Sequence, residues 1–450
     1  MKYALICAII LSGMILPFTC ASNEVQDTSS HQSSGEKLIQ AAEQKTSDIN
    51  EIVALTMDEA IRMVIKNNPE LKAFEIEIDA ASARIIQEKL LPNPSLFIET
   101  EDGSFKSFGF GNTYKASIGI MQPVPLGGKI SARTDIAMKE KEIVILEYEM
   151  KLRDTIAATK KAFMNILVAQ QIADIASDNF DIAQKLYDMA NIRVEALAAP
   201  QTELVKADIE LSHAQINLNN AKLELMQTEK LLHNLIGNID IRIKNYTGEV
   251  RHEVPALSSA AIEELIRISY PEILIAQKTR DLAGSHYNLA KAEKYPDIDI
   301  GVSVGREHLE IENNYVFQWA VNVPLPLFNR KQGRIQETKT NIQKAKKENA
   351  ALLNRVMQEV KQTFLAVENI ANQVETYEEK ILPQAEKSLA LMLEGYQEGI
   401  FTYMDLLDAQ RTLAHVREDY IRLLGQLNNA IIEMERLSGK TIDQLDKEEL

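Results

Sequence analysis

Cysteine, glycine and proline are scarce in this chain of 450 residues, and each scarcity removes a class of protein. The only two cysteines, Cys7 and Cys20, lie at the amino terminus, so the rest has no thiol for a disulfide framework, a zinc knuckle or a cysteine nucleophile. Gly and Pro together make up about 7% of the chain against a usual level of about 12%, which favours long uninterrupted helices over a loop-rich all-β fold. The net charge of −16 disfavours nucleic acid as a partner, and the 45% hydrophobic content predicts a folded chain.

Recognisable catalytic patterns are also missing from the sequence. No Gly-rich phosphate loop precedes a predicted helix, and no G-x-S-x-G elbow occurs. The seven histidines are scattered, with no pair at metal-ligand spacing on one helix. We therefore predict a protein that is not an enzyme, with no catalytic residue, no cofactor and no resident metal, so that any metal would be cargo.

The first residues have the form of an export signal. Lys2 precedes an apolar run from Ala4 to Phe18, which is shorter than the roughly 20 residues of a membrane-spanning helix. We expect residues 1–21 to be a signal peptide; a lipoprotein with Cys20 as its acylated first residue is the alternative. Residues 22–50 have the composition of a polar tail, and no later run of 18 apolar residues predicts a spanning helix.

Comparison of the chain with itself indicates a tandem duplication. At an offset of 202 residues, caps, prolines and glycine stops recur in the same order: Leu55-Thr56 with Leu257-Ser258, Pro69-Glu70 with Pro271-Glu272, Pro94 with Pro296, Leu204 with Leu406, and Gly237 with Gly439. We therefore predict two units of like fold, residues 51–250 and 251–450. Each is expected to run helix, strand, strand, very long helix, turn, helix.

Capping and stop signals give the helix ends. Thr56 and Glu59 form a capping box that opens the first helix, and Pro92 with Pro94 closes it. The long and returning helices are predicted over residues 129–195, 201–236, 332–397 and 403–438. Each long helix would extend about 100 Å and needs partners along its length. In the first of them, alanine recurs every seven residues, which indicates a seam for a neighbouring helix: Ala162, Ala169, Ala176, Ala183 and Ala190.

Four segments alternate apolar and polar residues, and we predict strands at about 93–102, 113–124, 296–305 and 314–324. Polar loops are expected from Asp102 to Thr113 and from Gly305 to Asn314. Two exposed hairpins with one face on a helical core are one interpretation. A length of about ten residues per strand, together with the single tryptophan beside Tyr315, favours a lipid-facing surface instead. The predicted membrane-facing residues are Tyr114, Ile118, Ile298, Ile300, Val302, Tyr315, Phe317, Trp319 and Val321.

Four strands cannot close a barrel, and open sheet edges are not tolerated in lipid. If these strands span a membrane, several chains must contribute to one closed sheet, and three chains would supply twelve strands.

Five motifs resemble the TolC-type outer-membrane efflux proteins over nearly the whole chain after residue 50. They are Leu-Thr-Met-Asp-Glu-Ala (55–60), Asn-Asn-Pro-Glu-Leu (67–71), Leu-Leu-Pro-Asn-Pro-Ser-Leu (90–96), Pro-Leu-Pro-Leu-Phe-Asn-Arg (324–330) and the run from Tyr396 to Arg411. The Gln122–Lys129 and Pro324 segments look most similar to the outer-membrane subunits of cobalt-zinc-cadmium or copper-silver resistance systems.

This resemblance implies a mainly α fold with a membrane β part. It implies a homotrimer with a twelve-stranded outer-membrane β-barrel, continued by a long periplasmic α-helical barrel. The implied partners are a periplasmic adaptor (membrane fusion) protein, an inner-membrane pump of the resistance-nodulation-division type, and outer-membrane lipid. The implied function is passive conduction of substrate, heavy-metal cations in particular, to the cell exterior.

The resemblance also points to residues at the helical tip. Asp405 and Asp408 fall on family positions whose carboxylates ring the periplasmic entrance, where they would act on gating and selectivity. A cap is the other interpretation, because Thr402 followed by Asp405 is a variant capping box. The expected tip-turn and adaptor-contact residues are Gly399, Thr402, Leu197 and Pro200, with Leu197 standing where the second unit has Gly399.

Two other functions stay open from the sequence. The same fold could serve multidrug efflux or type I protein secretion. A non-conducting coiled-coil spacer would explain the long helices but leaves the alternating strands without a purpose.

Overall fold

The computed structural model describes residues 51–102, 113–237, 242–254, 258–309 and 312–447. The chain divides into two compact parts, Met1–Glu51 and Ile52–Leu450, and the features below belong to the second part. The predicted signal peptide and the polar tail lie outside the described residues. The loop from Asp102 to Thr113 also lies outside them, apart from these two end residues.

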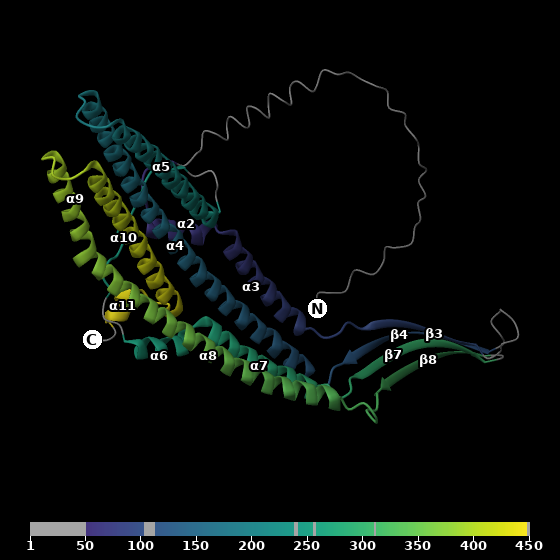
Figure 1. The fold of residues 1–450 in the computed structure, drawn as a ribbon. Coiled ribbons are helices and arrows are strands. Elements are labelled where there is room, and N and C mark those ends of the chain that lie inside the picture. The colour runs from purple at the N-terminus through teal and green to yellow at the C-terminus, as the bar shows by residue number, and fades with distance from the viewer. Residues whose placement is uncertain (1–50, 103–112, 238–241, 255–257, 310–311, 448–450) are drawn as a thin grey trace, which may run out of the picture. The chain divides into compact units, whose positions relative to one another are not determined.

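The element order repeats itself. The first half contains β1 (Glu51–Ile52), β2 (Leu55–Thr56), α2 (Met57–Asn67), α3 (Pro69–Glu88), β3 (Ser95–Asp102), β4 (Thr113–Val124), α4 (Lys129–Glu195), α5 (Gln201–Ile236), β5 (Arg242–Ile243) and β6 (Tyr246–Thr247). The second contains α6 (Ser259–Ser269), α7 (Pro271–Ala292), β7 (Ile298–Leu309), β8 (Glu312–Asn322), α8 (Gln332–Thr376), the π-helical turn η1 (Tyr377–Ile381), α9 (Leu382–Gln397), α10 (Tyr403–Ser438) and α11 (Ile442–Lys447). Figure 1 shows two long helical hairpins, one of α4 with α5 and one of α9 with α10.

Helix boundaries agree with the capping signals in the sequence. The capping box at Thr56 is formed, with the Glu59 amide donating to the Thr56 hydroxyl and the Thr56 amide donating to the Glu59 carboxylate. Both returning helices end at a glycine in the left-handed region, Gly237 (φ 74°) and Gly439 (φ 73°), where a side chain would be strained. The four predicted helix ranges are confirmed, with the third running through α8, η1 and α9.

The prediction of one continuous first helix in each unit is wrong. It is broken by a proline at the start of α3 and of α7, because the residue before a proline avoids the helical region. Asn68 also caps α3, its side-chain oxygen accepting from the amides of Glu70 and Leu71. Pro383 does not break its helix, and it lies directly after the π-helical turn η1. The wider turn makes room for a residue that lacks an amide hydrogen and crowds the preceding turn.

The small alanines lie where helices approach closely. Ala169, Ala183 and Ala190 are buried, in agreement with the predicted seam. Ala190 packs with Ala207 of α5 and Leu406 of α10 in one apolar cluster. Two further clusters lie farther along the helices, one around Phe163 and one around Val356. Among the described residues, no helix combines the length and the apolar character needed to cross a lipid bilayer.

The four long strands form one antiparallel sheet in the order β3-β4-β7-β8. Figure 1 shows this sheet beyond the ends of α3, α4, α7 and α8, away from the α5 and α10 hairpins. The predicted strand ranges hold for β4 and approximately for β3. The predicted loop from Gly305 to Asn314 is wrong, because β7 continues to Leu309 and β8 begins at Glu312.

One face of the sheet carries small residues beside Phe97 and Met121, and the other carries large apolar residues. Ser117, Gly119, Gly301 and Ser303 are buried on the first face, where a Cβ on Gly119 would lie 2.6 Å from the Cβ of Ser303. Such crowding explains why small residues occupy this face. The large apolar side chains stand on the other face, where no described helix covers them and Ile118, Val302 and Phe317 are exposed.

Candidate functional site

The two tip turns have the same backbone at an offset of 202 residues. The Ala198 amide donates to the Arg193 carbonyl (2.8 Å), and the Ile400 amide donates to the Gly395 carbonyl (2.7 Å). Gly399 has φ 77°, and its counterpart Leu197 takes the same left-handed conformation at φ 59° despite its side chain. That conformation costs a non-glycine residue about 1–2 kcal/mol. The Leu197 side chain is 93% exposed, so packing within this chain does not offset the cost.

The returning helices begin at equivalent residues. Pro200 is the N-cap of α5 and provides no side-chain hydrogen bond, whereas Thr402 is the N-cap of α10. The Thr402 amide and hydroxyl both donate to Asp405 Oδ2, at 2.9 and 2.6 Å. These hydrogen bonds lower the pKa of Asp405. The capping interpretation of Asp405 is therefore confirmed, and the carboxylate is exposed at the tip.

Asp408 lies one turn further along α10 and is also exposed. Its charge contributes to the raised pKa of Arg411, although the main cause is the hydrogen bond from Arg411 to Glu210. The structure thus places Asp405 and Asp408 together at the start of α10, but only Asp405 takes part in the cap.

Three side chains of the second hairpin contact acids of α5. Arg411 pairs with Glu210, its Nε donating at 3.0 Å. Arg422 binds both Glu224 oxygens, at 3.2 and 3.3 Å, and is also held by Glu418 (3.0 Å) of its own helix. Nearer the tip, the Tyr396 hydroxyl donates to Glu203 (3.0 Å).

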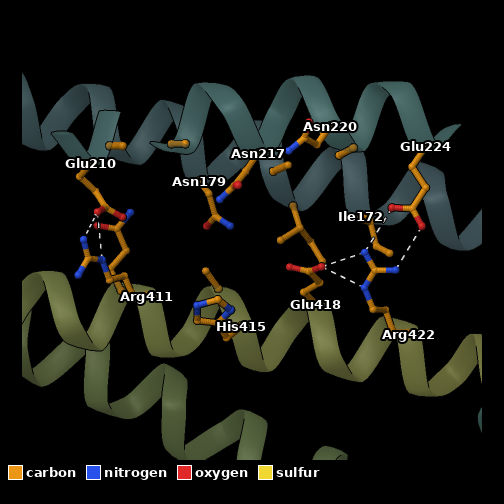
Figure 2. A pocket seen from close by; sticks show the side chains of 17 residues that line it. Ile172, Asn179, Glu210, Asn217, Asn220, Glu224, Arg411, His415, Glu418 and Arg422 are labelled. Atoms are coloured by element: carbon orange, nitrogen blue, oxygen red, sulfur yellow. Dashed lines mark hydrogen bonds and ion pairs between the residues drawn. The ribbon is translucent and has the colours of Figure 1, made fainter. Parts of the chain in front are cut away.

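A polar cleft of about 360 Å³ lies between α4, α5 and α10, with the Arg411 and Arg422 pairs at its two ends (Figure 2). Asn179, Asn217 and His415 line its middle. Gln410 also lines it and is 7% exposed, and its side-chain oxygen has no hydrogen-bond partner in the part of the chain that the structure describes. Tyr403, the first residue of α10, is buried, which raises its pKa to about 12.

None of these contacts between the hairpins was predicted. The partners are 201, 198 and 193 residues apart, so no local pattern relates them. The first two separations are close to the repeat offset of 202, because Arg411 and Arg422 lie on α10 and their partners on α5, the equivalent helix of the first unit. Opposite charges one repeat length apart are the signal that could have revealed them.

The predicted membrane-facing residues lie on one face of the sheet, as far as their side chains are described. The register aligns Ile118 with Val304 and Phe317, and Ile120 with Val302 and Trp319. Exposure is 68% for Phe317 and 75% for Trp319, and Ile118, Ile300, Val302, Tyr315 and Val321 are exposed as well. Ile298 is half-buried, and the backbone of Tyr114 lies in β4 while its side chain is outside the described part.

Within the described ranges, no group of three or more His, Cys, Asp or Glu side chains is arranged to hold a metal ion. The predicted site residues lie at two places, the exposed apolar face of the sheet and the charged tips of the helices.

Comparison with known proteins identifies this arrangement. Residues 60–238 and 264–440 match the family model described as Outer membrane efflux protein. The chain belongs to this family. The TolC-type resemblance is confirmed, and with it the mainly α fold with a membrane β part and the location in the outer membrane with a periplasmic helical extension.

The relatives of this efflux protein include a metal resistance protein and a pyoverdine export protein. It is 28% identical over 393 residues to the cobalt-zinc-cadmium resistance protein CzcC of Cupriavidus metallidurans, covering 86% of this chain and 90% of CzcC. It is 20% identical to the pyoverdine export outer membrane protein OpmQ of Pseudomonas putida, covering 90% of this chain and 85% of OpmQ.

Solved structures show the same fold. CusC superimposes with a TM-score of 0.72 at 16% identity, covering 85% of this chain and 92% of CusC. The CmeC outer membrane channel of Campylobacter jejuni gives 0.71 at 16% identity, covering 87% of this chain and 89% of CmeC.

Proposed function

We propose that this efflux protein is the passive outer-membrane channel subunit of a tripartite system that exports heavy-metal cations. In this proposal it performs no catalysis: an inner-membrane pump of the resistance-nodulation-division type drives transport, and a periplasmic adaptor connects the pump to the channel. The described part of the chain supplies the channel wall, and the cargo passes through without a resident metal or cofactor.

The observation that carries the proposal is the uncovered apolar face of a four-stranded sheet. Transfer of an exposed Val, Ile or Phe side chain from water to an apolar phase is favourable by about 1.5–3 kcal/mol, so a face that carries Ile300, Phe317 and Val321 favours lipid over water. Trp319 and Tyr315 on the same face suit the interfacial aromatic belt.

The sheet edges explain why the channel must be an oligomer. β3 and β8 are the edge strands, each paired on one side only within this sheet. Lipid offers no hydrogen-bond partner for the other side, so each edge must pair with another chain. Three copies would close a twelve-stranded barrel, which is the homotrimer that we propose.

The acidic tip supports cation transport. In a trimer, Asp405 and Asp408 would place six carboxylates around one axis and attract multivalent cations. The tip turns, with Gly399, Thr402, Leu197 and Pro200, are the surface that we propose for the adaptor.

The similarity to CzcC favours metal cations as the cargo, whereas the similarity to OpmQ favours small organic molecules as the second candidate. A deletion strain distinguishes the two. We expect increased sensitivity to zinc, cobalt, cadmium, copper or silver, restored by the intact gene. Increased sensitivity to dyes and antibiotics alone would reject the metal assignment and retain the channel.

A further inference from the structure

A short apolar turn connects strand to long helix in each unit, and in the first unit it is packed. The turn from Pro123 to Gly128 leads from β4 into α4 and lies against the junction between α7 and β7. The Leu126 amide donates to Asp297 Oδ1 (3.2 Å), and Lys129 Nζ pairs with the same oxygen (2.5 Å). A Cβ on Gly127 would lie 2.8 Å from Tyr295 Cδ2 and 2.8 Å from the Ala292 carbonyl oxygen, so the contact leaves no space for a side chain.

The equivalent turn of the second unit has no such cover among the described residues. Pro123-Val124-Pro125-Leu126 recurs 201 residues later as Pro324-Leu325-Pro326-Leu327, between β8 and α8. Here Leu325 is 73% exposed, Leu327 63% and Phe328 90%. Three large apolar side chains in sequence are therefore in contact with solvent.

The junction that would receive this turn is exposed too. Tyr295-Pro296-Asp297 corresponds, 202 residues earlier, to Asn93-Pro94-Ser95 between α3 and β3. Beside it, Leu90 is 54% and Leu91 61% exposed, whereas Ala292, the counterpart of Leu90, is buried beneath the first turn. Each unit thus provides half of a contact that the described part of the chain forms once.

Within one chain the two exposed halves cannot meet. The turn follows edge strand β8 and the junction precedes edge strand β3, and these strands are separated by two others, a distance of about 14 Å at normal strand spacing. A second copy placed with its β3 beside β8 brings the halves together. This head-to-tail arrangement repeats from copy to copy and can close into a ring.

We propose that the 324–330 turn of one copy docks on the α3–β3 junction of the next, with Phe328 against Leu90 and Asn93. The side-chain sizes are complementary. In the internal contact the small residue Gly127 faces the large Tyr295, whereas in the proposed contact the large Phe328 faces the smaller Asn93. The inference rests on the assembly of the proposed channel, and it adds an apolar joint between subunits where strands pass into helices.

Cysteine cross-linking tests this contact. The pair Leu327→Cys with Ser95→Cys occupies the positions equivalent to Leu126 and Asp297. In outer membranes treated with a short thiol-specific cross-linker, we expect covalently linked oligomers on denaturing gels. The matched control, Leu126→Cys with Asp297→Cys, should give only a link within one chain. Each single-cysteine variant should stay unlinked.

A third pair separates failure of the joint from failure of the channel. In the β4–β7 pair, Ile120 lies opposite Val302. Their counterparts at the repeat offsets of 201 and 202 residues are Val321 of β8 and Thr100 of β3, so we expect Val321 to lie opposite Thr100 of the next copy. If Val321→Cys with Thr100→Cys links copies but Leu327→Cys with Ser95→Cys does not, the docking of the turn is wrong and the channel stands. If neither pair links copies, the proposed assembly is wrong as well.

Labelling of Phe328→Cys provides a measurement that does not require a paired variant to fold. A polar maleimide should modify this cysteine at least about tenfold more slowly in the native protein in outer membranes than in the same chain unfolded in detergent, because a packed contact protects it. Equal rates in the two states would overturn the proposal.

Discussion

The Asp405 carboxylate has two roles that substitutions can separate. It accepts hydrogen bonds from Thr402 at the start of α10, and its negative charge adds to that of Asp408 at the exposed tip. An asparagine retains an acceptor oxygen for the cap but carries no charge.

We predict that Asp405→Asn with Asp408→Asn weakens block of the channel current by multivalent cations such as Zn²⁺. Removal of six charges near one axis should lower the local cation concentration by about tenfold or more, since each such interaction approaches 1 kcal/mol even in water. Single-channel recording at several Zn²⁺ concentrations measures the effect. The control Thr402→Ala removes the cap, should cost about 1 kcal/mol of stability, and should leave the block unchanged. A wild-type block in the double asparagine variant would reject the acidic ring.

Residue-level prediction from the sequence succeeded where the chemistry is local. The cap at Thr402 and the glycine stops at Gly237 and Gly439 depend on neighbours within a few residues, and each lies where it was expected. Leu197 shows the limit. Its left-handed conformation is imposed by the turn that it shares with Gly399, which outweighs the preference of leucine itself.

At the scale of elements, ion pairs between the two hairpins add to the packing of α10 on α4. Arg411–Glu210 and Arg422–Glu224 connect equivalent helices of the two units. Because α10 carries the acidic tip, we expect these ion pairs to influence the position of the carboxylates. Release of α10 should therefore change conduction.

We predict that Arg411→Glu increases the open fraction of the channel by at least about fivefold, the range expected for loss of 1 kcal/mol or more of coupling. The exchange Arg411→Glu with Glu210→Arg should restore the original behaviour. A matched control is Arg417→Gln, which removes a 3.0 Å pair with Glu386 inside the second hairpin and should change little. If the charge exchange fails to restore conduction while Arg411→Glu still alters it, the ion pair is not the cause.

The elements were predicted unevenly for physical reasons. The long helices α4, α5 and α10 end at the expected residues because capping and glycine signals are strong. The breaks before Pro69 and Pro271 were missed although each has a local signal, since the residue before a proline avoids the helical region. The end of β7 and the start of β8 were missed because strand pairing extends through polar residues such as Glu307 and Asn314. The site contacts on α5 were not predicted, because they depend on tertiary packing and their one sequence signal is opposite charge about one repeat length apart.

At the scale of the whole molecule, one charged cluster connects helices of both units. Arg436 of α10 donates to Glu433 (2.7 Å), Asp154 of α4 (3.1 Å) and Glu359 of α8 (2.9 Å). Burial raises the pKa of Glu433, but hydrogen bonds and charge from Arg436 and Lys161 outweigh it, so the pKa is lowered from 4.5.

We predict that this cluster loses its stabilising effect in acid. A carboxylate whose pKa is lower in the folded state stabilises the protein above its unfolded pKa, and the effect is lost as the pH falls through the folded value. Glu433→Gln should therefore lower stability at pH 7 by up to about 1 kcal/mol, with the difference from wild type shrinking below pH 4.5. Thermal unfolding followed by circular dichroism at pH 7 and pH 3 measures it, with the exposed Asp419→Asn as control. A difference that is equal at both pH values would contradict the assignment.

The central claim is that sheets from identical copies combine into one sealed, water-filled passage through the outer membrane. Single-channel current across a planar lipid bilayer containing the purified, folded protein tests it most directly. We predict discrete current steps of uniform size, carried by a stable trimer and favouring cations over anions. If the folded protein enters the bilayer but passes no current, the account is contradicted. It is also contradicted if the folded protein stays a soluble monomer and passes no current.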